Sequence, residues 1–140
     1  MAESPEPSQN QEPNGELFIQ TVAMPADTNA NGDIFGGWLL SQMDIAGGIA
    51  GRNYSAGRTV TIAVESMTFR KAVKVGDVVS CYAELIKVGT TSMTYRIEAW
   101  AIRAQSFVRE KVTEGVFTYV AIGTNGRPRK VHPDQDMEEV

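Results

Sequence analysis

The sequence predicts an α+β fold in which a five-stranded antiparallel sheet wraps over one long central helix. Three observations support this prediction. An apolar, strand-like segment at residues 17–24 ends before Pro25, and a polar, turn-rich loop follows it. A long apolar segment, at about residues 36–53, is predicted to be helical. Four strand-like segments then come in succession, at residues 58–69, 77–88, 91–102 and 111–122.

The strand-like segments carry the two-residue period of strands with one buried face. In residues 91–102 the side chains expected in the core alternate with polar ones: Met93, Tyr95, Ile97, Ala99 and Ala101. Trp100 interrupts the polar face of this segment, so it either packs within the chain or contacts another subunit. In residues 58–69 the apolar phase shifts at Met67, as a β-bulge would produce. Gly89-Thr90 is predicted to be a hairpin turn.

Composition limits the class of protein. The chain has 140 residues, 42% of them hydrophobic and 21% charged, which is the balance of one ordinary globular domain. The formal net charge of -4 argues against a nucleic-acid binder, and no apolar run has the roughly 18 residues that cross a bilayer. The start lacks the basic and apolar regions of a secretory signal. The single cysteine, Cys81, fits a reducing compartment, so we expect a cytoplasmic protein.

The chain divides into three regions. Residues 1–15 are rich in Pro, Glu, Gln, Asn and Ser, so we expect a disordered N-terminal tail. Residues 16–122 carry the periodic segments and form the predicted domain. Residues 123–140 are polar, with turn residues and an acidic finish, which predicts a C-terminal tail.

Asp44 is the only formally charged residue between Gly36 and Gly51 in the predicted helix. The helix is apolar or small nearly all round, so we expect it to be buried on most faces. The glycines near Asp44 on the helix surface indicate that something approaches the backbone closely there: Gly47, Gly48 and Gly51. A buried carboxylate persists when it is paired, hydrogen-bonded or functional. Asp44 is therefore either a structural partner of a backbone group or an arginine, or a catalytic base or nucleophile.

Spacing and absences favour the catalytic interpretation. Gly36-Gly37 opens the helix two turns before Asp44, so free backbone N–H groups and the positive end of the helix dipole point into the same region. Hydrolysis of a carbonyl compound needs such a group to stabilise the developing anion. The only histidine, His132, lies in the predicted tail, which argues against a Ser-His-Asp triad and a zinc site. We expect no metal and no cofactor.

Three stretches of the sequence carry a family resemblance. They are AMPADTNANGDIFGGWLLSQMDIAGG at residues 23–48, VESMTF at residues 64–69 and VGDVVSCYAELIKVGTTS at residues 75–92. The chain resembles the bacterial hot-dog-fold acyl-CoA thioesterases over about residues 16–128. The resemblance implies the hot-dog fold, a long central helix wrapped by an antiparallel sheet. It also implies hydrolysis of acyl-CoA thioesters to free CoA and a fatty acid.

The resemblance assigns roles to residues at matching positions. Asp44 matches the helix acid that activates water or attacks the thioester carbonyl. Gly36 and Gly37 match the turn whose backbone N–H groups polarise that carbonyl. Asn31 and Asp33 lie in the loop that supplies a polar side chain to the site in related enzymes. For Asp33, a solvated turn residue is the equal alternative.

The resemblance also implies recognition of coenzyme A by its phosphates and adenine near a subunit boundary. The candidate residues are basic, hydroxyl-bearing or in a tight turn, and for each one taken alone an ordinary solvated or turn residue is the stronger alternative: Arg58, Thr59, Thr61, Arg70, Lys71, Lys87, Gly89, Thr90, Thr91 and Ser92. Two subunits are expected to pair so that the helix acid of one faces the glycine turn of the other. The expected functional unit is a homodimer, with a hexamer as a trimer of dimers in relatives.

Two other functions remain open from the sequence. A non-enzymatic acyl-CoA or acyl-carrier binding module would use the same pocket, with Asp44 as a structural hydrogen-bond acceptor. A hot-dog dehydratase or hydratase would need a histidine in the core region, and residues 1–131 contain none. The sequence predicts neither the acyl length nor whether Asp44 acts as base or nucleophile.

Overall fold

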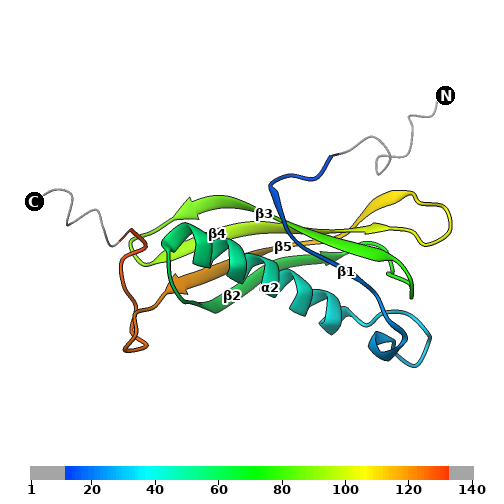
Figure 1. Cartoon of the computed structure of the whole chain (residues 1–140), viewed down its shortest axis with the longest axis horizontal. Helices are drawn as coiled ribbons and strands as arrows, with labels where there is room; N and C mark the ends of the chain where they lie inside the picture. Colours follow the sequence, from blue (N-terminus) through cyan, green and yellow to red (C-terminus); the bar gives the residue numbers. More distant parts are fainter. Residues whose placement is uncertain (1–11, 133–140) are drawn as a thin grey trace, which may run out of the picture.

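The computed structural model describes residues 12–132, and the predictions for residues 1–11 and 133–140 lie outside the described residues. Its elements are β1 (Glu16–Val22), the short 3-10 helix η1 (Pro25–Asp27), α2 (Gly36–Ser55), β2 (Thr59–Phe69), β3 (Val78–Val88), β4 (Ser92–Ile102) and β5 (Arg109–Ala121). The strands form one antiparallel sheet in the order β1-β3-β4-β5-β2, and α2 lies across one face of it (Figure 1). The predicted α+β architecture is confirmed.

The core lies between α2 and the face of the sheet that the helix covers. The buried residues of the first three turns of α2 recur at helical spacing: Leu39, Met43, Ala46 and Gly47. On β4 the five alternating residues predicted to share a buried face are at most 3% exposed, which confirms that prediction. β3 and β4 form the predicted hairpin, in which the Gly89 N–H donates to the Ser92 carbonyl over 2.8 Å.

One face of α2 is not covered by the sheet. Ile45 and Ile49 are 48% and 36% exposed, so the prediction that the helix is buried on most faces is wrong for a single chain. One sheet covers only one side of a helix, and burial of the other side needs a further chain. β2 is an edge strand, and Val60, Ile62 and Val64 on it are also exposed. An unpaired strand edge with exposed apolar side chains is typical of a protein–protein contact.

The predicted bulge in β2 is confirmed. The pairing of β2 with β5 shifts register between Glu65 and Thr68, and Ser66 has a φ of +55°. Beyond the bulge, Phe69 contacts the start of α2, because a Cβ on Gly36 would lie 3.3 Å from the Phe69 ring. The end of β2 therefore helps to enclose the helix N-terminus.

The C-terminal segment that the structure describes packs on the domain. Val131 is buried, and its N–H donates to the Thr90 carbonyl over 2.9 Å. The Arg129 guanidinium donates to the Ser55 carbonyl at the end of α2, also over 2.9 Å. The packed unit therefore extends to residue 132, beyond the predicted boundary at residue 122, because one apolar side chain and one arginine anchor an otherwise polar segment.

Trp100 packs within the chain. Its indole N–H donates to Glu98 Oε1 over 2.9 Å, and the Arg109 guanidinium lies 5.5 Å from the ring centroid. The Asn14 side-chain amide donates to Glu98 Oε2 over 2.9 Å, on the face of the sheet opposite α2. Residues 12–15 of the predicted N-terminal tail thus contact the two side chains that contact Trp100, since Glu12 accepts a hydrogen bond from Arg109, and Trp100 is 1% exposed. Its burial needs no second subunit.

Candidate active site

Asp44 lies near the middle of α2 and faces strands β2 and β5. The Thr61 hydroxyl donates a hydrogen bond to Asp44 Oδ1 over 2.8 Å, and the Tyr119 hydroxyl donates to the same oxygen over 3.0 Å. Asp44 is half-buried. Within residues 12–132 these partners are hydroxyl groups and not a cation, so the arginine-paired alternative is not what the structure shows. A charged carboxylate beside an open strand edge can accept a proton from water or attack a carbonyl carbon.

Tyr119 is a buried hydrogen-bond donor. It is 1% exposed, and its ring stacks on Phe117 with the centroids 6.5 Å apart. Burial, followed by the nearby negative charge of Asp44, raises the pKa of Tyr119 above its ordinary value near 10. The hydroxyl therefore stays protonated at neutral pH. Sequence reasoning missed this residue, because nothing in β5 distinguishes it from other core aromatic residues.

The start of α2 presents free backbone donors. Phe35 caps the helix in an extended conformation and its side chain makes no capping hydrogen bond. Gly36 and Gly37 are exposed, and they occupy helix positions whose N–H groups have no partner within the helix. Together with the positive end of the helix dipole, these N–H groups can stabilise a carbonyl oxygen that develops negative charge.

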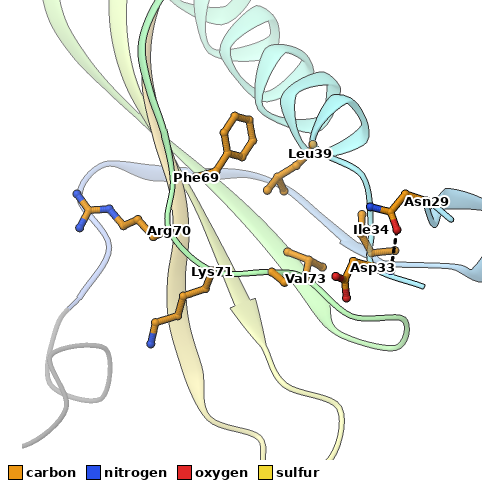
Figure 2. Close-up of a pocket in the computed structure, with 10 residues that line it drawn as sticks. Asn29, Asp33, Ile34, Leu39, Phe69, Arg70, Lys71 and Val73 are labelled. Atoms are coloured by element: carbon orange, nitrogen blue, oxygen red, sulfur yellow. Dashed lines mark hydrogen bonds between the residues drawn. The ribbon is translucent and has the colours of Figure 1, made fainter. Parts of the chain in front are cut away.

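A cavity of about 380 Å³ adjoins Gly36. Figure 2 shows Leu39 and Phe69 projecting into the space between α2 and the end of β2, whereas Arg70 and Lys71 point away from it. The inner part of this cavity is apolar, and the charges lie at its rim. Such an arrangement suits a ligand with an apolar portion and a charged portion.

Asn29 organises the loop before the helix. Its side-chain oxygen accepts hydrogen bonds from the N–H group of Asn31, over 2.8 Å, and from that of Asp33, over 3.1 Å. Figure 2 shows the bond between Asn29 and Asp33. The Asp33 carboxylate lines the cavity at Gly36 and pairs with Lys74, while Asn31 is exposed. Sequence reasoning missed Asn29, although an Asn two residues before the Asn31-Gly32 turn is the signal of an Asx turn.

The helix itself separates the two halves of the predicted site. Gly37 and Asp44 are seven residues apart, and a rise of 1.5 Å per residue places their backbones about 10 Å apart. Asp44 does not line the cavity at Gly36. A hydrogen bond to a carbonyl oxygen spans only about 3 Å, so one carbonyl group cannot contact both residues of the same chain.

Several predicted coenzyme A contacts lie at the C-terminal end of α2. Arg58 and Thr59 line a second cavity, of about 440 Å³, beside the exposed Ile45 and Ile49 of the helix. Arg52 adds a second guanidinium to this cavity. The β3–β4 turn lies at the same end, where the C-terminal segment binds the Thr90 carbonyl, and it contains Gly89, Thr90, Thr91 and Ser92.

The other predicted contacts lie elsewhere. Arg70 and Lys71 are at the rim of the cavity beside Gly36, at the opposite end of α2, where Lys71 pairs with Glu110 over 3.4 Å. Lys87 is exposed on β3. Thr61 contacts Asp44. The structure therefore does not bring the predicted coenzyme A residues together in one chain.

Two further observations concern the chemistry available. Within residues 12–132, no three His, Cys, Asp or Glu side chains are grouped so as to hold a metal ion. In the same part of the chain, no helix has both the length and the apolar character needed to cross a membrane.

Comparisons with known proteins agree on one family. The profile described as the thioesterase superfamily matches residues 31–105. The acyl-CoA thioester hydrolase YciA of Salmonella typhimurium is 56% identical over 120 residues, which cover 84% of this chain and 90% of that protein. A hexameric thioesterase from Yersinia pestis is 56% identical, with a TM-score of 0.82, over 85% of this chain and 98% of its own. A hexameric hot-dog-fold thioesterase of Campylobacter jejuni is 39% identical, with a TM-score of 0.81, over 89% of this chain and 96% of its own.

Proposed function

Because this chain belongs to the thioesterase superfamily and has the hot-dog fold, as the sequence predicted, we propose that it hydrolyses acyl-CoA thioesters to free CoA and a carboxylic acid. The similar Salmonella protein is named an acyl-CoA thioester hydrolase. The proposed chemistry uses a carboxylate, backbone N–H groups and water, and it needs no metal or cofactor. A cytoplasmic location suits this substrate.

The observation that carries the proposal is the placement of the Asp44 carboxylate. It is held by two hydroxyl groups, is not neutralised by a cation among residues 12–132, and lies beside an open sheet edge. As a base, Asp44 takes a proton from water while the water oxygen bonds to the thioester carbon. The tetrahedral intermediate then breaks its C–S bond, and the CoA sulfur leaves with that proton. As a nucleophile, the Asp44 carboxylate bonds to the acyl carbon while the C–S bond breaks, which gives a mixed anhydride and the CoA thiolate. Water then cleaves the anhydride to the carboxylic acid and the Asp44 carboxylate, and the released proton passes to the CoA thiolate.

The site as proposed needs two chains. Gly37 of the same chain is about 10 Å from Asp44 along the helix, which is too far to polarise the same carbonyl. We propose that Gly36 and Gly37 of a second copy supply these donors, in a homodimer that covers the β2 edge and the exposed isoleucines of α2. The hexameric state of the Yersinia and Campylobacter proteins supports a homo-oligomer.

Coenzyme A is proposed to lie along the exposed side of α2. The cavity lined by Arg52 and Arg58 offers two guanidinium groups, which bind phosphate through paired N–H donors. Ile45 on the same cavity lies one residue after Asp44. A phosphate group on Arg58 would therefore leave the thioester end near the catalytic carboxylate.

Replacement of the catalytic acid is the direct test. We expect Asp44→Asn and Asp44→Ala to lower kcat by at least about 100-fold, because the proton acceptor is lost. Release of the CoA thiol is followed with a thiol-trapping reagent over a series of acyl lengths, and the assembly is checked by light scattering. Glu84→Gln is the matched control, since it neutralises a carboxylate that is 43% exposed on β3.

The result that contradicts the proposal is activity of both Asp44 variants within a few-fold of the wild type in an intact assembly. Tight binding of acyl-CoA by the wild-type protein without any thiol release would instead support the non-enzymatic binding module.

A further inference from the structure

We propose that Tyr119 is the positioning residue of the active site: it holds Asp44 by Oδ1, leaves Oδ2 as the reacting oxygen, and requires the glycine at position 47. This inference rests on the proposed function and assigns a separate role to each oxygen of the Asp44 carboxylate.

The hydrogen bonds to Asp44 are asymmetric. Thr61 and Tyr119 both donate to Oδ1, over 2.8 and 3.0 Å, while Oδ2 has no hydrogen-bond partner within residues 12–132. The two donors are direct cross-strand partners on β2 and β5. Side chains of such a pair lie on the same face of the sheet, so they hold one oxygen from two sides. A carboxylate held in this way cannot exchange its oxygens without breaking both hydrogen bonds.

The Tyr119 hydroxyl also fixes the helix. It lies 3.1 Å from the Asp44 backbone carbonyl as well as 3.0 Å from the carboxylate. The pKa of the buried Tyr119 hydroxyl is raised, so the hydroxyl stays protonated near neutral pH and remains a hydrogen-bond donor to Asp44 throughout the reaction. The Tyr119 hydroxyl oxygen therefore fixes the positions of both the backbone and the side chain of Asp44.

Gly47 makes this contact possible. A Cβ at position 47 would lie 2.1 Å from the Tyr119 hydroxyl oxygen and 2.6 Å from its Cζ, both far inside contact distance. The neighbouring Gly48, by contrast, has no atom within 4 Å of its Cβ position. A glycine inside a helix costs about 1 kcal/mol relative to alanine. The close approach of Tyr119 is a physical reason for a glycine at position 47 and not at position 48.

The consequence for the reaction is a division between the two oxygens. Oδ1 is occupied by permanent donors, so Oδ2 is the atom that takes the proton from water or bonds to the acyl carbon. Loss of the tyrosine hydroxyl leaves the carboxylate with one anchor and lets Oδ2 move. A displacement of about 1 Å from reactive geometry typically costs on the order of 100-fold in rate.

The test is Tyr119→Phe, which keeps the buried ring and removes only the hydroxyl. We expect kcat to fall by about 10- to 100-fold while KM stays within about twofold, since the substrate contacts are unchanged. Tyr95→Phe is the matched control. Tyr95 is also buried on the helix-facing side of the sheet, with its ring 6.2 Å from that of Tyr119, but it does not bond Asp44. The kcat of the Tyr95→Phe variant should stay within twofold of the wild-type value.

A second variant checks the role of the glycine. Gly47→Ala should lower kcat to a similar extent, because the added methyl group displaces the Tyr119 hydroxyl. The double variant with Tyr119→Phe does not isolate this contact, since the ring Cζ and Ile97 Cδ1 both lie 2.6 Å from the same Cβ position. Thermal unfolding of each variant shows whether it is folded. If Gly47→Ala does not fold, Tyr119→Phe decides alone.

The outcomes separate this inference from the proposed function. A folded Tyr119→Phe protein with wild-type kcat, alongside an inactive Asp44→Asn protein, overturns the positioning role and leaves the proposed function standing. An active Asp44→Asn protein overturns the proposed function itself. An equal loss of kcat in Tyr95→Phe and Tyr119→Phe means that general packing, and not the bond to Asp44, is responsible, and this also overturns the inference.

Discussion

Cys81 shows how burial sets the chemistry of a single side chain. It lies in β3, fully enclosed by the core, and burial raises the pKa of its thiol to about 12 from an ordinary value near 9. The thiolate is the reactive form of cysteine, so the thiol of the folded protein is inert near neutral pH. The proposed active site accordingly makes no use of this thiol.

The thiol also makes stability depend on alkaline pH. In the folded state the proton is held up to about pH 12, whereas the unfolded chain releases it near pH 9. The thiol therefore contributes stability that is complete below pH 9 and declines as pH rises toward 12, by up to about 1.4 kcal/mol per pH unit. Urea unfolding at pH 8 and pH 11 should show a smaller decline for Cys81→Ala than for the wild type. Equal declines in the two proteins would disprove this assignment.

At the scale of elements, Arg103 joins three parts of the chain. Its guanidinium donates to Asp77 Oδ2 over 2.7 Å, to the Ala72 carbonyl over 2.8 Å and to Glu110 Oε1 over 2.8 Å. These bonds tie the end of β4 and the start of β5 to the loop before β3, which carries Lys74. The hydrogen bond from Arg103 lowers the pKa of Glu110 below its ordinary value of 4.5. The ionised Glu110 side chain therefore contributes to the free energy of unfolding above pH 4.5, and this contribution is lost as pH falls below that value.

Removal of Arg103 should be costly because Asp77 is only 3% exposed in its side chain. We expect Arg103→Gln to lower the free energy of unfolding by about 3 kcal/mol, the usual effect of leaving a buried charge unpaired. Arg96→Gln is the control, since both side chains of its ion pair with Glu84 are 43% exposed. The Arg96→Gln variant should lose less than about 1 kcal/mol of the free energy of unfolding. Denaturant unfolding near neutral pH compares the two variants, and equal losses would refute the distinction.

The elements and the hairpin of neighbouring strands could be predicted from the sequence, whereas the pairing of strands far apart in the sequence could not. Periodicity locates α2 and the strands, and the phase shift at Met67 locates the bulge, because these signals lie within a few residues of each other. The clamp on Asp44 depends on Thr61 facing Tyr119, and this requires the pairing of β2 with β5, which local patterns do not contain. For the same reason the sequence, which predicts Thr61 as a coenzyme A contact, does not reveal its hydrogen bond to Asp44, the proposed catalytic acid.

At the scale of the whole molecule, the proposed active site is incomplete in a single chain. The middle of α2 carries the Asp44 carboxylate and its N-terminal end carries the free N–H groups, and the distance of about 10 Å between them prevents their use on one carbonyl. The exposed side of the helix and the unpaired β2 edge lie where a second copy would supply the missing half. Subunit complementation follows from this arrangement.

Co-assembly of two inactive variants should restore activity. Asp44→Ala removes the acid, and Gly37→Pro removes a backbone donor at a helix position where proline is tolerated. In a mixture that forms dimers at random, half of the dimers contain both variants, and each of these has one intact site, so we expect about one quarter of the wild-type rate. Each variant alone should be inactive. An inactive mixture in which native mass spectrometry detects mixed dimers would show that each site is built from one chain.

The contact between Gly47 and Tyr119 also constrains how this sequence can diverge. Even without the hydroxyl, the ring carbon Cζ lies 2.6 Å from where a methyl group at position 47 would begin. Ile97 Cδ1 lies equally close to that point, at 2.6 Å. A descendant can therefore accommodate a larger residue at position 47 only if the side chains at positions 119 and 97 both make room for it.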